Sequence, residues 1–364
     1  MHKKIDSTLG MSYFGVVFNA GGVWEEKGRR GCSHLMEHLM CKTYEHLYPK
    51  MRRLDVADNA MTSDNKVVFY ASGLDECVAQ VSQDMLDGLT EQTKLWSKEQ
   101  FDTEKKIVLQ EYGDCFNYQL YGALENAMRI NYGFYSAIGL REDIENFTYE
   151  DSLVMAKEVF SKPRMIVTVG DHSVSYKGEF RFSIPKQFAS HGKYDVEQEV
   201  VPKEDQTVVA LIHNDPLNIK QATTYNLLRD CLALGLESPL YQEIREKRGL
   251  AYAVYFFESV INNDIVPIVA AQTANENAKE LSDSFENFFC TSMSDLISVE
   301  RFNDCRDGLL YRKRKVEILP YKGVLQTEIA DYNPFEGLED VSREDVLSLG
   351  EELLDISKFE LVQS

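Results

Sequence analysis

Short apolar runs alternate with longer amphipathic segments along this chain, and the two patterns predict strands and helices respectively. In the first half they predict strands near 13–19 and 65–71, and helices around 31–38 and near 74–92 and 98–118. In the second half they predict strands near 207–213, 251–258 and 265–272, and helices near 219–233, around Arg245, and near 275–291 and 298–316. This mixture is typical of an α+β protein in which helices pack against a sheet.

One sequence pattern occurs twice at a constant offset of 194 residues. The first copy begins at Thr148 and Asp151, and the second begins at Ser342 and Asp345. Each copy has the pattern of a capped amphipathic helix followed by a short strand. Duplication of a domain is the simplest explanation, and a chance match is the alternative. The sequence therefore predicts two homologous sandwich domains, each a mixed sheet covered by helices.

Glycine and proline residues between 170 and 205 interrupt a polar stretch that has no sustained periodicity. At 364 residues the chain is long enough for two domains. We therefore predict a first domain at 1–175, an interdomain linker at 176–204 and a second domain at 205–364.

An acidic composition narrows the range of partners. The chain has 39 lysine and arginine residues against 59 aspartate and glutamate residues, a formal net charge of −20. This charge argues against nucleic acid as a partner and would attract basic peptides if it lines a binding site. The chain has no apolar run of membrane-spanning length and no apolar signal at its start, so we expect no membrane association and a cytoplasmic location.

The segment around 31–38 places two imidazoles and a carboxylate on one helical face. His34, Glu37 and His38 form the pattern H-x-x-E-H, whose members are neighbours at i, i+3 and i+4. Neutral histidine is a preferred zinc ligand, and an adjacent carboxylate can take a proton from a metal-activated water. The spacing is that of the inverted zinc-peptidase motif, with a structural histidine pair as the alternative.

A second helix can supply the third zinc ligand. Ser97 and Gln100 form a capping-box pattern before a helical run that carries Glu104 and Glu111. Seven residues are close to two turns, so the two carboxylates share a face. Glu111 is our candidate ligand and Glu104 is better suited to orienting one; an ordinary solvated face is the alternative.

With these residues in place, the chain resembles the insulinase/pitrilysin family of zinc peptidases. It is most similar to short two-domain members related to the mitochondrial processing peptidase beta subunit. The matching segments are Ala20-Gly21-Gly22-Val23-Trp24-Glu25, the His34 to His38 motif, Asn59-Ala60-Met61-Thr62-Ser63 and the pair Glu104 and Glu111. The resemblance implies a processing-peptidase-like metallohydrolase fold with one Zn²⁺ per chain. It implies that His34, His38 and Glu111 bind zinc, that Glu37 is the general base and that Glu104 supports the site.

Two further segments carry implied substrate roles. The residues Asn59, Ala60, Met61 and Thr62 resemble the edge strand to which the family's peptide substrates add, with an ordinary strand as the alternative. The segment from Ser238 to Tyr252 resembles the family's other signature. By that resemblance, Arg245 and Tyr252 hold the substrate near zinc. The alternative is a purely structural role, in which Arg245 lies on an amphipathic helix and Tyr252 begins a buried strand.

The sequence thus predicts a zinc metalloendopeptidase that hydrolyses extended, unstructured peptides in a chamber formed by dimerisation. The first domain would hold zinc, and the second would carry the Arg245 and Tyr252 signature without a metal. A homodimer would be self-sufficient, and a heterodimer with a homologous subunit is the alternative. Two other functions stay open: a catalytically silent peptide-binding or scaffold subunit, and a metal hydrolase for a non-peptide substrate.

Two features depart from the family pattern. The chain starts close to the second expected strand, so we expect the first strand to be shortened or missing and strand 13–19 to lie at a sheet edge. The family's glycine-rich lead into the substrate strand reads Asp55-Val56-Ala57-Asp58 here.

Overall fold

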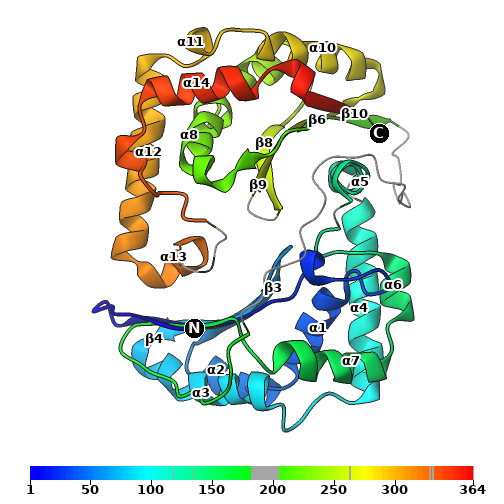
Figure 1. Ribbon diagram of the computed structural model, residues 1–364, viewed down its shortest axis with the longest axis vertical. Coiled ribbons are helices and arrows are strands. Elements are labelled where there is room, and N and C mark those ends of the chain that lie inside the picture. Colours follow the sequence, from blue (N-terminus) through cyan, green and yellow to red (C-terminus); the bar gives the residue numbers. More distant parts are fainter. Residues whose placement is uncertain are drawn as a thin grey trace. The chain divides into compact units, whose positions relative to one another are not determined.

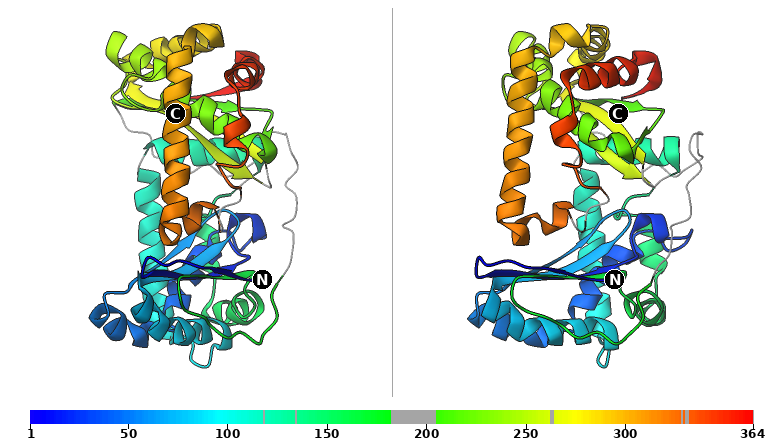
Figure 2. Two further views of the ribbon diagram at one scale, coloured as in Figure 1. Left: turned by 90° about the vertical axis from the view of Figure 1, so that its left-hand side faces the viewer. Right: turned by 60° about the vertical axis from the view of Figure 1, so that its left-hand side comes forward.

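The computed structural model describes residues 1–117, 119–133, 135–181, 205–261, 264–327, 329 and 332–363. These residues form two compact units, each containing one five-stranded sheet. Residues 1–114, 135–181 and 316–325 make up the first unit, and the other described residues make up the second. Figure 1 labels the elements of both units, and Figure 2 shows each unit from two further sides. No helix in the described part of the chain is long and apolar enough to cross a membrane.

The sheet of the first unit has the strand order β1-β5-β2-β4-β3. Its strands are β1 (His2–Ile5), β5 (Met165–Val169), β2 (Met11–Phe18), β4 (Val67–Leu74) and β3 (Ala57–Thr62). Strand β1 is parallel to β5, and the other neighbours are antiparallel. The predicted strands near 13–19 and 65–71 are confirmed as β2 and β4.

The expected edge position of strand 13–19 is wrong, whereas the first strand is present and short. Strand β1 is present at His2–Ile5, and β2 lies at the centre of the sheet rather than at its edge. The reason is tertiary: β5 returns more than 140 residues later and enters the sheet between β1 and β2. All residues of β2 after Met11 are buried, in keeping with its nearly continuous apolar sequence.

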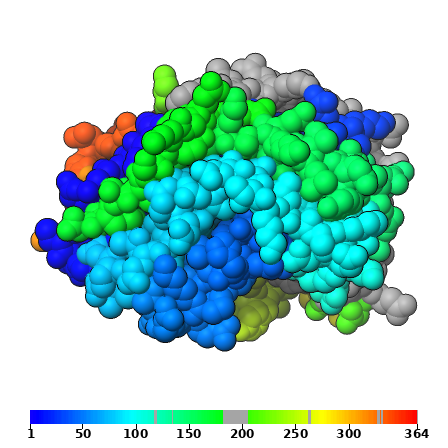
Figure 3. All heavy atoms as spheres, turned by 90° about the horizontal axis from the view of Figure 1, so that it is seen from below, coloured from blue at the N-terminus to red at the C-terminus, as the bar shows by residue number. Residues whose placement is uncertain are grey.

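Helices cover one face of this sheet, and Figure 3 looks onto that helical layer from below. They are α1 (Cys32–Cys41), α2 (Tyr48–Arg53), α3 (Asp75–Glu91), α4 (Lys98–Asn117), α6 (Arg141–Asn146) and α7 (Tyr149–Met155). Phe18, Phe69 and Phe160 pack ring against ring in the core between sheet and helices. The predicted helices around 31–38 and near 74–92 and 98–118 are confirmed. In α4, Ser97 and Gln100 form the predicted capping box.

The second unit contains another five-stranded sheet, in which β8 pairs with β9 beside the order β10-β6-β9-β7. Its strands are β6 (Gln206–His213), β7 (Leu217–Asn218), β8 (Val254–Ile261), β9 (Asp264–Ala274) and β10 (Phe359–Gln363). Its helices include α5 (Gln119–Tyr132), α8 (Ala222–Ala233), α9 (Pro239–Tyr241), α10 (Ala278–Phe289), α11 (Met293–Leu296) and α14 (Arg343–Leu353). Two more helices, α12 (Val299–Ile318) and α13 (Pro320–Thr327), have residues in both units.

The internal repeat predicted from sequence is present in the structure. Thr148 and Asp151 form a reciprocal capping box at the start of α7, which leads to β5. Ser342 and Asp345 form the same box at the start of α14, which leads to β10. Strands β5 and β10 then pair antiparallel with β2 and β6, respectively. Each unit therefore contains the same capped helix and strand.

The division into units differs from the predicted domains at two segments. Helix α5 falls within the predicted first domain, but it packs against β6, β9 and β10 and joins the second unit. Residues 316–325 fall within the predicted second domain but group with the first unit. Contacts between segments distant in sequence decide both placements, and sequence order does not reveal them. The predicted linker stays a prediction, because residues 182–204 lie outside the described part of the chain.

Candidate metal centre

The loop before α1 is held by two carboxylates. The Glu25 carboxylate accepts hydrogen bonds from the backbone N–H groups of Gly31 and Ser33, each at 2.6 Å. Gly31 has a positive φ of 87°, and a Cβ there would lie 2.7 Å from the Ile138 carbonyl oxygen. The Asp143 carboxylate accepts from the backbone N–H groups at 28 and 30. These contacts satisfy donors at the helix N-terminus and fix where α1 begins.

Helices α1 and α4 bring His34, His38 and Glu111 together. One potential ligand atom from each residue lies within 4.8 Å of the other two. Glu111 Oε2 lies 3.4 Å from His34 Nε2 and 3.7 Å from His38 Nε2. Two imidazole nitrogens and a carboxylate oxygen match the donor set of catalytic zinc sites, which keep a fourth position for water. The three residues therefore fit a zinc ion, although their assignment as ligands stays a prediction.

The protonation of His34 suits metal binding. Burial first, and then the neighbouring His38, lower the pKa of His34 to about 4. The imidazole is therefore neutral near pH 7, and its nitrogen lone pair is free to bind a metal.

Glu104 contacts His38 and Lys42, and its role as a residue that orients a ligand stays a prediction. Its Oε2 lies 3.1 Å from Nδ1 of His38, and its Oε1 lies 2.7 Å from Nζ of Lys42. Burial alone would raise the pKa of Glu104, but the hydrogen bonds from Lys42 and His38 hold it below its usual range. A carboxylate on the second ring nitrogen fixes the tautomer and orientation of a metal-binding histidine. Lys42 was not among the residues singled out from sequence, although it follows His38 by one helical turn.

We expect Glu104→Ala to weaken zinc binding about 10- to 100-fold, because His38 loses the group that orients it. Competition with a chromogenic chelator would measure the zinc affinity. Glu99→Ala, one turn earlier on the exposed start of α4, is the matched control and should bind zinc as the wild type does. Unchanged affinity in Glu104→Ala would contradict this role.

Glu37 points from α1 towards β3. Its Oε2 accepts a hydrogen bond of 2.6 Å from Oγ1 of Thr62. Burial raises the pKa of Glu37, and the Thr62 hydrogen bond opposes that rise. A carboxyl group with a raised pKa beside a candidate metal site has the properties of a general base. Thr62 was singled out from sequence only as part of the substrate strand, and its contact with Glu37 depends on the pairing of β3 with β4.

We expect Thr62→Val to move the acidic limb of the pH–rate profile upwards by about half a unit to one unit. Without the hydroxyl donor, the charged form of Glu37 is less stable and its pKa rises. A base with a higher pKa stays protonated, and therefore inactive, up to a higher pH. Measuring kcat/KM against pH would test this, with Thr62→Ser as the control that keeps the donor. An identical acidic limb in Thr62→Val would contradict the role of the hydrogen bond.

The predicted substrate residues lie on β3, at one edge of the first sheet. Asn59 donates a hydrogen bond from Nδ2 to the Tyr70 hydroxyl at 3.3 Å. Met61 is exposed, whereas Ala60 and Thr62 are partly buried. The backbone N–H of Ala60 donates to Oδ1 of Asn59 at 2.9 Å, so a peptide that adds to this edge would replace that bond.

Arg245 and Tyr252 lie in the second unit and contact one another. Arg245 Nη1 donates to the Tyr252 carbonyl oxygen at 2.9 Å, and its guanidinium lies 4.5 Å from the centre of the Tyr252 ring. The Tyr241 ring lies 5.0 Å from the same guanidinium. Tyr252 precedes β8 and is 82% exposed, so the alternative that it begins a buried strand is wrong. Their role towards a substrate stays a prediction.

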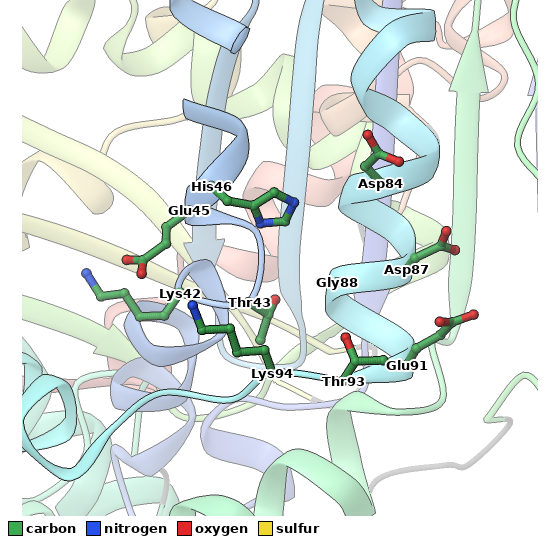
Figure 4. A pocket seen from close by; sticks show the side chains of 10 residues that line it. All are labelled: Lys42, Thr43, Glu45, His46, Asp84, Asp87, Gly88, Glu91, Thr93 and Lys94. Atoms are coloured by element: carbon green, nitrogen blue, oxygen red, sulfur yellow. The ribbon is translucent and has the colours of Figure 1, made fainter. Parts of the chain in front are cut away.

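A separate cavity of about 630 Å³ lies between the segment after α1 and helix α3 (Figure 4). It is lined by charged and polar side chains together with Gly88: Lys42, Thr43, Glu45, His46, Asp84, Asp87, Glu91, Thr93 and Lys94. None of the predicted catalytic, metal-binding or substrate residues lines it.

Comparison with known families gives two matches along the chain. Residues 4–135 match the family described as Insulinase (Peptidase family M16), and residues 175–309 match the Peptidase M16 inactive domain. Together the two matched segments make up most of the chain. The segment with the H-x-x-E-H motif thus matches the peptidase description, and the segment without a counterpart of it matches the inactive one.

Relatives with similar sequences carry related names. An "Uncharacterized zinc protease YmxG" of Bacillus subtilis is 22% identical over 317 residues, covering 79% of this chain and 76% of that protein. An "Uncharacterized zinc protease" of Rickettsia felis is 23% identical over 328 residues, covering 83% of this chain and 78% of that protein.

Solved structures show the same fold. The crystal structure of a protease from Helicobacter pylori has a TM-score of 0.77 at 17% identity, covering 99% of this chain and 95% of that chain. A peptidase M16 inactive domain from Pseudomonas fluorescens has a TM-score of 0.77 at 16% identity, covering 100% of this chain and 94% of that chain. These similarities confirm the predicted α+β fold of two domains.

Proposed function

Because the chain belongs to the insulinase family, peptidase family M16, we propose that it is a zinc-dependent endopeptidase that hydrolyses extended, unstructured peptides. The observation that carries this proposal is the group formed by His34, His38 and Glu111, with the Glu37 carboxyl on the same helix as the histidines. Within the family, we infer that the chain is most closely related to the short two-domain members.

His34, His38 and Glu111 would hold one zinc ion per chain, and Glu104 would keep His38 in its binding orientation. When bound, zinc supplies Lewis acidity and lowers the pKa of a water molecule. Glu37 takes the proton from the water that attacks the peptide carbonyl, and then delivers it to the leaving amine. The Thr62 hydroxyl donates to the Glu37 carboxylate and would position it to take the first proton.

The substrate would add to β3 as a further strand, with backbone hydrogen bonds that tolerate many sequences. A guanidinium and a phenol suit an extended peptide, because Arg245 can donate to a carbonyl and Tyr252 can stabilise an oxyanion. We propose that two copies of the chain, or one copy and a homologous subunit, form the chamber in which this occurs. Most folded proteins would be excluded, because the substrate must be extended to pair with a strand.

A silent peptide-binding or scaffold subunit is the second candidate, because part of the chain matches a domain described as inactive. That match covers the half without the H-x-x-E-H motif, whereas the other half brings together three residues that could hold a metal ion, which supports the enzyme. Peptide cleavage, measured together with zinc content, separates the two functions.

The test is cleavage of a mixed library of unstructured peptides, read by mass spectrometry, with zinc measured in the same preparation. A small-ester and small-amide panel run in parallel would detect a non-peptide hydrolase. We expect one zinc per chain and cleavage of peptides that a chelator stops. Bound zinc with no cleavage of peptides would overturn the endopeptidase proposal and favour the binding subunit.

A further inference from the structure

Strand β3 has one open edge and one face directed towards α1. Its backbone pairs with β4 on one side, and no other strand in the described part of the chain pairs with it. Side chains alternate along a strand, so Asp58, Ala60 and Thr62 share a face. The hydrogen bond from Thr62 to Glu37 identifies this face as the one towards α1. The charge on Asp58 therefore lies on the side of the sheet where the chemistry is proposed to occur.

The surroundings of Asp58 agree with this orientation. Burial first, and then the charges of Glu37 and Asp58, raise the pKa of Cys41 at the end of α1. The Asp58 charge also contributes to the raised pKa of Tyr48 in α2, after burial and Cys41. The Asp58 charge thus acts on one group at the end of α1 and one in α2.

Asp58 forms no ion pair with a cation among the described residues. Burial raises its pKa, and among the described residues no cation acts on it to oppose that rise. The residue is nevertheless exposed at the strand edge. A partly desolvated carboxylate that is still accessible gains most from a cation supplied by a ligand.

The register of β3 gives the position of that cation. A peptide that adds antiparallel to the open edge places alternate side chains on the α1 face. The side chain opposite Thr62 lies beside Glu37, and the side chain opposite Asp58 comes four residues later in the peptide. At a rise of about 3.3 Å per residue, the two are about 13 Å apart. Because Glu37 is proposed to act on the bond beside the peptide residue opposite Thr62, the residue opposite Asp58 would be on the C-terminal side of the scissile bond.

We propose that Asp58 forms a subsite for a lysine or arginine side chain, four residues C-terminal to the substrate residue that lies opposite Thr62. This inference rests on the proposed peptidase function and adds a position-specific preference to it. The net charge of −20 supports it only in a general way, because a diffuse field attracts basic peptides without selecting a position.

The test uses one unstructured peptide with a single cleavage site, in which a lysine replaces glutamine at each position in turn. We expect wild type to prefer lysine by about fivefold in kcat/KM at one position on the C-terminal side, and less at high salt. Asp58→Asn should lose this preference. Asp84→Asn, which removes the same charge from α3, is the matched control and should retain it.

A second measurement separates binding from catalysis. In the Glu37→Gln background, the peptide with lysine at the selected position should bind about fivefold more tightly than its glutamine counterpart, measured by fluorescence anisotropy. Adding Asp58→Asn should remove the difference. Cleavage without a preference that depends on Asp58 would overturn this inference and leave the peptidase function intact. Absence of cleavage of every peptide would overturn the proposed function and this inference with it.

Discussion

Glu37→Gln is expected to abolish peptide hydrolysis while zinc stays bound. Glutamine keeps the size of the side chain and a hydrogen-bond acceptor for the Thr62 hydroxyl, but it cannot take a proton from water. General-base catalysis contributes about 100- to 10,000-fold, so we expect kcat to fall by up to about 10,000-fold. Steady-state cleavage of a fluorogenic peptide, together with zinc quantified in the same sample, would measure both effects.

The matched control is Glu99→Gln, the same chemical change at an exposed position of α4. It should leave both activity and zinc content unchanged. If Glu37→Gln retained full activity, Glu37 would not be the base. If it lost zinc, the carboxylate would act in metal binding rather than in proton transfer.

His38→Ala is expected to remove zinc and activity together. Nε2 of His38 lies 3.7 Å from Oε2 of Glu111, the predicted third ligand. Its Nδ1 lies 3.1 Å from Oε2 of Glu104, the residue predicted to orient it. Loss of one of three ligands should weaken zinc binding by at least about 1,000-fold. Metal content after dialysis and peptide cleavage would test this, with His46→Ala, a histidine outside the metal group, as the control.

Thermal stability gives this variant a second readout. A metal that binds only the folded state stabilises it by about 2.7 kcal/mol at 100 times its Kd. Added zinc should therefore raise the Tm of the metal-free wild type and of His46→Ala by about 3–7 °C, and that of His38→Ala by much less. An equal rise in all three proteins would place the zinc elsewhere.

Most of the elements could be predicted from local patterns. The capping boxes at Thr148 and Ser342 and the periodicity of α3 and α4 are set by neighbouring residues, so they are visible in the sequence. The order of the strands depends on contacts between segments that are distant in the sequence. Strand β2 was expected at an edge, but β5 pairs with it from more than 140 residues away. The placement of α5 with the second sheet depends in the same way on distant contacts.

The same distinction between local patterns and distant contacts applies to the candidate site. Helical geometry alone puts His34, Glu37 and His38 on one face of α1, and places Glu104 and Glu111 two turns apart on α4. The packing of α4 against α1 then decided that Glu111 lies near both histidines and that Lys42 and His38 share Glu104. The pairing of β3 decided that Thr62 reaches Glu37 and that Asp58 faces the same side. The sequence by itself thus determined the chemical groups and their spacing within each helix, because covalent geometry and helical periodicity act over a few residues. Only the tertiary structure decided which groups from different elements meet, because hydrophobic burial and strand pairing join segments regardless of their separation along the chain.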